Sequence, residues 1–95
     1  AFPNPARTST TIRFETALAP LEAGIYVFDL VGNLVKEFSD SQISRMGGGL
    51  QHVVWNLNNS AGQSVAPGVY NVMVKIRGGT ENQSATVIKK LAVVR

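Results

Sequence analysis

Side chains that could carry out acid–base chemistry are few in this chain and stand far apart. His52 is the single histidine, and an imidazole can act as a general base near neutral pH. No cysteine is present, no serine stands in a recognisable nucleophile setting, and one histidine cannot complete a zinc site. No two of the six acidic residues have the spacing of a glycosidase pair or an EF-hand loop. We therefore interpret His52 as a surface-facing strand residue and predict no enzyme activity and no metal site.

Two glycine-containing segments could bind ions. Asn56–Gly62 offers amide oxygens that can ligate calcium, but it contains no carboxylate, so such a site would be weak. Gly47-Gly48-Gly49 is not followed by the Lys-Ser/Thr pair of a phosphate-binding loop, and no helix is predicted to open there. We interpret the first segment as an Asn/Gly turn, with weak calcium binding as the alternative, and the second as part of a flexible loop. No cofactor is predicted.

The charge and the length of the chain narrow the remaining classes of function. The chain has 95 residues, nine basic and six acidic, for a net charge of +3. The basic residues are scattered, with Lys89-Lys90 the single adjacent pair, which does not resemble a nucleic-acid-binding stripe. No apolar run reaches the length of a membrane helix, and no signal peptide is recognisable. Since the chain begins at Ala1 without Met, we expect residues 1–95 to be one domain of a larger protein.

The elements that must position any site are strands, because apolar residues recur with a period of two. The segment from Ile25 to Leu30 is apolar on both faces, as in a central strand. Leu34–Phe38 is predicted as its return strand, and Ser39–Leu50 as a polar surface loop. Other alternating segments are Ile12 with Phe14; Val53, Trp55 and Leu57; and Tyr70, Val72, Val74 and Ile76.

The last part of the chain reads as a hairpin. Tyr70 to Arg77 and about Ala85 to Val94 are predicted to pair, with Gly78 to Gln83 as the loop. No segment has a helical stripe. About seven short strands therefore predict an all-β fold, an immunoglobulin-like antiparallel β-sandwich without a disulfide, in which Trp55 is the largest core residue.

Two features of these strands suggest binding rather than catalysis. The last strand could lie at a sheet edge and accept a strand from a receptor. Outward apolar residues could form a partner patch or a packing surface against the rest of the parent protein. These are Tyr26, Phe28, Ala92 and Val94.

Four segments resemble, in order and spacing, the motifs of a known family. They are Phe2-Pro3-Asn4-Pro5 with Ser9 to Phe14, Val27 to Val35, Val53 to Gly62 with Pro67-Gly68-Val69-Tyr70, and Lys89-Lys90-Leu91 to Arg95. The family is the immunoglobulin-like domain of the flagellar hook-capping protein, which merges in sequence with the C-terminal sorting domains of the type IX secretion system of Bacteroidetes.

The resemblance implies a non-catalytic C-terminal domain that directs an exported protein through the periplasm to the outer membrane and cell surface. Its partners would be outer-membrane sorting proteins or other domains of the parent protein, with no nucleic acid and no transmembrane segment. In the family, a Gly-Tyr hairpin and a Lys-rich last strand carry recognition. By position, the recognition residues are Gly68, Tyr70, Lys89, Lys90, Leu91, Val93 and Arg95.

The resemblance also leaves a second hypothesis. Domains of this type occur as permanently retained modules. The parent would then be a type IX component, such as its signal-cleaving cysteine peptidase, a secreted hydrolase or a hook-capping-type assembly protein.

Overall fold

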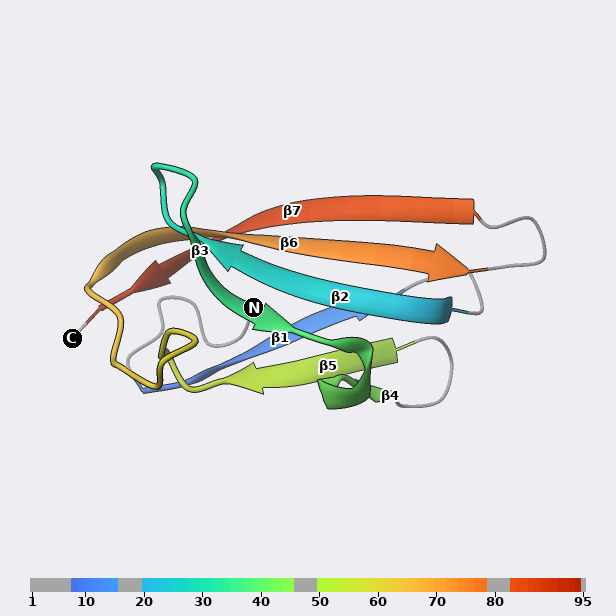
Figure 1. Cartoon of the computed structure of the whole chain (residues 1–95), viewed down its shortest axis with the longest axis horizontal. Helices are drawn as coiled ribbons and strands as arrows, with labels where there is room; N and C mark the ends of the chain where they lie inside the picture. Colours follow the sequence, from blue (N-terminus) through green and yellow to red (C-terminus); the bar gives the residue numbers. More distant parts are fainter. Residues whose placement is uncertain (1–7, 16–19, 46–49, 79–82, 95) are drawn as a thin grey trace.

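The structure is a sandwich of two antiparallel sheets (Figure 1). It is a computed structural model that describes residues 8–15, 20–45, 50–78 and 83–94. One sheet has three strands in the order β1-β5-β4, and the other has four in the order β3-β2-β6-β7. The strands are β1 (Thr10–Glu15), β2 (Pro20–Phe28), β3 (Leu34–Phe38), β4 (Ser44–Arg45), β5 (Leu50–Trp55), β6 (Gly68–Gly78) and β7 (Gln83–Val93). The predicted all-β sandwich is confirmed.

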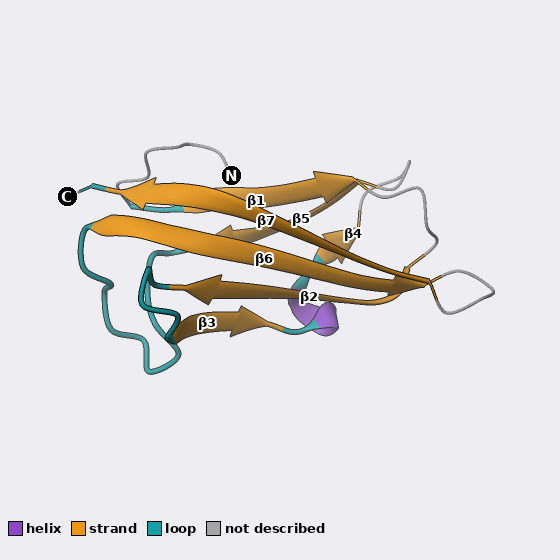
Figure 2. Cartoon of the chain, turned by 90° about the horizontal axis from the view of Figure 1, so that it is seen from above, coloured by secondary structure: helices purple, strands orange, loops and turns teal. Residues whose placement is uncertain are grey.

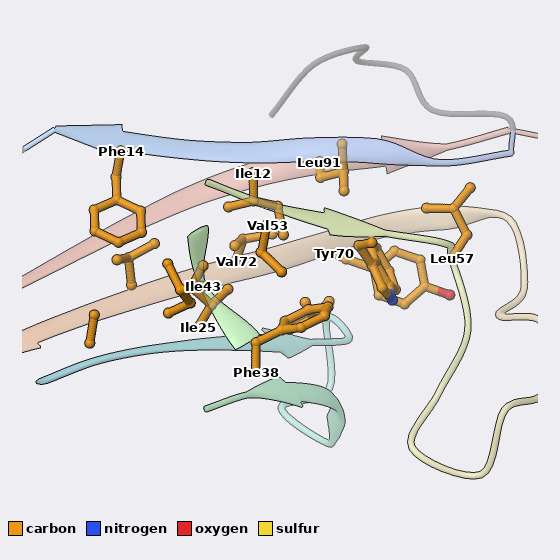
Figure 3. Close-up of a cluster of buried hydrophobic side chains, with 14 of the residues drawn as sticks. Ile12, Phe14, Ile25, Phe38, Ile43, Val53, Leu57, Tyr70, Val72 and Leu91 are labelled. Atoms are coloured by element: carbon orange, nitrogen blue, oxygen red, sulfur yellow. The ribbon is translucent and has the colours of Figure 1, made fainter. Parts of the chain in front are cut away.

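The core lies between the two sheets and consists mainly of the apolar residues that alternate along the strands. Figure 3 shows side chains from β1, β5, β6 and β7 meeting in one cluster. Trp55 is fully buried there, and its ring meets the Tyr70 ring edge-on, with centroids 5.9 Å apart and planes at 77°. The Trp55 Nε1 donates a hydrogen bond to the Asn58 carbonyl at 2.8 Å, so the polar end of this large side chain has a partner inside the fold.

Strand β2 is central in its sheet, between β3 and β6 (Figure 2). Ile25 and Val27 are fully buried on the core side. On the outer side, the Tyr26 ring lies against Gly24, where an added Cβ would come within 2.9 Å of the Tyr26 hydroxyl. The Lys75 Nζ stands 5.7 Å from the centre of the Tyr26 ring. Strand β2 is therefore apolar on both faces because one face packs in the core and the other is a partly covered surface.

The prediction of a plain surface loop over Ser39–Leu50 is wrong in part. Asp40–Gln42 forms a turn of 3₁₀ helix, β4 follows as a short edge strand, and Leu50 already belongs to β5. Ile43 is only 6% exposed, so its side chain packs this segment against the core. The Asp40 Oδ1 also accepts a hydrogen bond from the Ala23 amide of β2 at 2.9 Å. The Gly47-Gly48-Gly49 run, predicted to be flexible, lies outside the described residues.

Strands β6 and β7 form the longest ladder, from Gly68 opposite Val93 to Gly78 opposite Gln83. Both strands have 11 residues, so each extends beyond the segment that alternation predicts. Strand β7 lies at the edge of the four-stranded sheet, and β3 forms the opposite edge (Figure 2). Among the described residues, no helix is long and apolar enough to cross a membrane.

Candidate recognition surface

The β6–β7 hairpin brings most of the predicted recognition residues together. Its cross-strand pairs include Gly68 with Val93, Tyr70 with Leu91, Val72 with Lys89, and Asn71 with Lys90. Six of the seven predicted residues therefore lie on two adjacent strands, and Arg95 lies outside the described residues.

These six residues divide into a buried set and an exposed set. Tyr70, Leu91 and Val93 are 7%, 0% and 2% exposed, and a partner cannot reach side chains so deep in the core. Gly68, Lys89 and Lys90 are exposed. The hairpin thus separates residues that hold the strand in place from residues that a partner can contact.

Lys89 and Lys90 do not form one patch, because neighbouring residues of a strand point to opposite faces. Lys89 is on the face that Leu91 and Val93 turn toward the core, yet it stays exposed at the open margin between β7 and β1. A small gap lies there, lined by Ile12 and Phe14 of β1 and by Val87, Lys89 and Lys90 of β7. Because of the pleat, the Lys89 and Lys90 side chains leave the strand in opposite directions, although both residues border the gap.

Strand β7 offers an open edge along most of its length. Every residue from Ser84 to Lys90 is exposed, and among the described strands β7 has a neighbour only on the side of β6. An edge of this kind presents backbone N–H and C=O groups that can pair with another strand. An inward-pointing charge, such as that of Lys89, is a common device against indiscriminate pairing of such edges.

The start of β6 is held by the Tyr70 side chain. Its hydroxyl donates a hydrogen bond to the Ala66 carbonyl, four residues earlier, as in the tyrosine corner of immunoglobulin-like sandwiches. Gly68 between them has a φ of +154°, in a region that side-chain-bearing residues avoid. The Gly-Tyr pair is therefore explained by backbone geometry, which fixes where β6 begins and hence where β7 ends.

The outer face of the four-stranded sheet carries an apolar surface that the sequence located only in part. The predicted patch residues Tyr26, Phe28, Ala92 and Val94 are only half-buried. The most exposed large apolar side chains nearby are Leu30 at 64%, Val31 at 86% and Ile88 at 59%. Leu30 and Val31 lie in the turn after β2, where alternation gives no signal. The sequence could have placed Ile88 on the outer face, because Ile88 is two residues from Lys90 and alternate residues of a strand share a face.

Two turns of this domain have the same five-residue construction. In the turn after β2, the Asp29 Oδ1 accepts hydrogen bonds from the Val31 and Asn33 amides at 3.0 and 2.9 Å. In the other turn, the Asn59 Oδ1 accepts hydrogen bonds from the Ala61 and Gln63 amides at 2.9 and 3.0 Å. The fourth residue of each is glycine with positive φ, +97° at Gly32 and +81° at Gly62. The side-chain oxygen of the first residue thus organises each turn.

This geometry bears on ion binding. The predicted calcium alternative at Asn56–Gly62 needs side-chain oxygens directed at a cation, but the Asn59 Oδ1 is directed at two backbone amides. In the described part of the chain, no three His, Cys, Asp or Glu residues stand close enough together to hold a metal ion. His52 is half-buried on β5, opposite Arg13 of β1 and Ser44 of β4.

The hydrogen bonds to Asp29 also predict a pH dependence. Backbone and side-chain N–H groups, those of Asn33 above all, lower the pKa of the Asp29 carboxyl below its ordinary value of 3.8. A carboxylate with a lowered pKa stabilises the fold above its ordinary pKa, and this contribution is lost as the pH falls through the lowered value. We expect Asp29→Asn to keep the turn, as Asn59 does in its own turn, and to remove this loss of stability below about pH 3.8.

The measurement is thermal unfolding by circular dichroism from about pH 6 to about pH 2.5. The reciprocal variant Asn59→Asp is the control, because it should add a second acid-sensitive contribution. An acid profile of Asp29→Asn identical to that of the unmodified domain would contradict the assignment.

The family model described as the secretion system C-terminal sorting domain matches residues 1–93. No curated protein matches the chain. A similar solved structure is that of dimeric latent PorU from Porphyromonas gingivalis, with a TM-score of 0.74 and 25% identity. PorZ, a surface component of the type IX secretion system of the same bacterium, has a TM-score of 0.57 and 24% identity. This chain is 98% covered in the first comparison and 99% in the second, but it spans only 9% of the PorU chain and 11% of the PorZ chain.

FlgD from P. aeruginosa is also similar, with a TM-score of 0.66 and 13% identity, over 90% of this chain and 67% of that one. At that identity the likeness shows the fold alone. The flagellar hook-capping part of the resemblance gains no support from the family match.

Proposed function

This chain belongs to the secretion system C-terminal sorting domain family, and we propose that its β6–β7 hairpin is the part that the outer-membrane machinery recognises. As a type IX sorting domain, the chain directs export to the outer membrane, the cell surface or the medium. The domain acts by binding, and any catalysis belongs to the larger exported protein from which we infer it comes.

One observation carries this proposal: β7 is an exposed edge strand from Ser84 to Lys90, and the Lys89 and Lys90 side chains leave it in opposite directions. The backbone of the edge supplies hydrogen-bonding groups for a receptor strand, which gives affinity. Lys89 and Lys90 supply the charge that selects an acidic partner. Tyr70, Leu91 and Val93 act indirectly, because they hold this edge in place from the core.

The test fuses residues 1–95 to a periplasm-targeted fluorescent protein in a bacterium with a type IX system. We expect Lys89→Gln/Lys90→Gln to lower the surface and medium reporter about tenfold or more, since a hydrogen bond to a charged group contributes about 1.5–3 kcal/mol and about 1.4 kcal/mol is a factor of ten. Lys36→Gln, on β3 at the opposite edge of the sheet, is the matched control. Circular dichroism of the purified domains checks that the unmodified domain, Lys89→Gln/Lys90→Gln and Lys36→Gln are all folded.

A retained docking module is the second candidate, and the exposed Leu30, Val31 and Ile88 side chains favour it. Such a module would pack against its parent protein and need no export receptor. A folded, wild-type fusion that stays in the periplasm of a type IX-competent cell would support this candidate and overturn the recognition proposal.

A further inference from the structure

The inner face of β7 is covered along only part of the strand. Alternate residues of a strand share a face, so Val87, Lys89, Leu91 and Val93 all belong to the face that is turned toward the three-stranded sheet. Leu91 and Val93 are buried, but Val87 is 42% exposed and Lys89 is exposed as well. From Lys89 back to Val87, β7 therefore extends past the cover that the other sheet provides.

The small gap between β7 and β1 reaches the apolar core at this point. Its apolar lining comes from three strands: Ile12 and Phe14 of β1, Val72 and Val74 of β6, and Val87 of β7. The free volume is about 20 Å³, which is room for one group of about the size of a water molecule or a methyl group. We call this space the margin gap. Because both sheets line it, the margin gap exists only when the sandwich is assembled.

The charges around the margin gap indicate what it accepts. Arg13 borders it from β1, and Lys89 and Lys90 border it from β7, so every charged side chain in its lining is a cation. Among the described residues, none of these three cations has an ion-pair partner. A cluster of unpaired cations favours an acidic ligand, and the apolar lining beside them favours an aliphatic group.

We propose that the margin gap selects the sequence of the receptor strand that pairs with β7. A strand hydrogen-bonded to the β7 edge turns every second side chain toward the inner face. Its residue beside Val87 would be a small aliphatic one that fills the gap, and its residue beside Lys89, two positions along, would be Asp or Glu. Arg13 faces the same carboxylate from the other sheet. This inference rests on the proposed function, because it requires a receptor strand at this edge.

The variants for the test fill the margin gap or reverse one of its charges. Val87→Phe supplies a ring from the domain itself to occupy the gap, and we expect the thermal unfolding temperature not to fall, because Val87 lies at the open margin. Val54→Phe is the matched control, since Val54 is 50% exposed on β5, in the other sheet. Arg13→Glu leaves the gap open and reverses one charge, so it tests the inference even if Val87→Phe does not fold. Lys36→Glu on β3 is its control.

The readout is a photo-crosslinking amino acid at position 86 of the exported fusion. Thr86 is exposed on the β7 edge, but by alternation it faces away from the margin gap. We expect crosslinks to one protein segment that carries a small aliphatic residue and, two positions away, Asp or Glu. Val87→Phe and Arg13→Glu should each lower the crosslink yield about tenfold or more, and the two controls should not. Exchange of the partner's acidic residue for lysine should restore the crosslink to Arg13→Glu.

Several results would overturn the inference. These are crosslinks that neither Val87→Phe nor Arg13→Glu reduces, a crosslinked segment without an acidic residue, and crosslinks to lipid, to a second copy of the domain or to another part of the same chain. If export in the same cells still depended on Lys89 and Lys90, the proposed function would stand without this inference. A folded, unmodified fusion that stays in the periplasm and gives no crosslink from position 86 would contradict the proposed function, and this inference with it.

Discussion

Replacement of Trp55 by alanine is expected to remove a large share of the stability of the domain. Trp55 is fully buried, its ring packs edge-on against Tyr70, and its Nε1 donates to the Asn58 carbonyl. Removal of a buried tryptophan costs about 3–5 kcal/mol, against a total stability of about 5–15 kcal/mol for a domain. Urea unfolding followed by far-ultraviolet circular dichroism measures the loss, because Trp55 is the single tryptophan and its fluorescence disappears with it.

Trp55→Phe is the matched control for this prediction. Phenylalanine retains an aromatic ring in the core but cannot donate to the Asn58 carbonyl, so we expect a smaller loss of about 1–3 kcal/mol. If Trp55→Ala lost less than about 1 kcal/mol, Trp55 would not be the central residue of the core.

The second large effect is expected at Leu91, a residue that the family resemblance assigns to recognition. Leu91 is fully buried opposite Tyr70, and Figure 3 shows it inside the core cluster. Leu91→Ala should lower the free energy of unfolding by about 2–5 kcal/mol. Any loss of export in this variant should therefore follow the fraction of unfolded protein, measured by urea unfolding of the purified domain.

Ile88→Ala on the same strand separates the two roles of β7. Ile88 is 59% exposed, and exposed substitutions usually change stability by less than about 0.5 kcal/mol. A stable Leu91→Ala variant that still failed to be exported would show that Leu91 contacts the receptor itself.

Much of the fold could be predicted because strands with one buried face carry a clear period of two. Ile12 with Phe14, and Val53 with Trp55, are buried as their alternation indicates. The hairpin turn at Gly32 was predictable from glycine's tolerance of positive φ. These signals are local, so a single sequence contains them.

The features that sequence reasoning missed depend on long-range contacts. Ile43 is an apolar residue in a mostly polar segment. Its burial in the core and the hydrogen bond from the Ala23 amide to Asp40 hold that segment as a 3₁₀ turn and an edge strand. The same holds for the recognition surface. The adjacent letters Lys89 and Lys90 look like one basic patch, but the pleat of an edge strand sends them to opposite faces. The hollow lined by Phe28, Met73 and Ile88 joins residues of β2, β6, β7 and a turn, and no local pattern connects them.

The strand order has a mechanical consequence. Strand β1 pairs with β5 and β7 pairs with β6, and among the described strands no hydrogen-bonded pair joins the two sheets. A pulling force applied between the first and last strands therefore loads no ladder of backbone hydrogen bonds that joins them directly. We therefore expect side-chain packing between the sheets to bear this force. Such a domain should unfold at a lower pulling force than a sandwich whose first and last strands are paired directly.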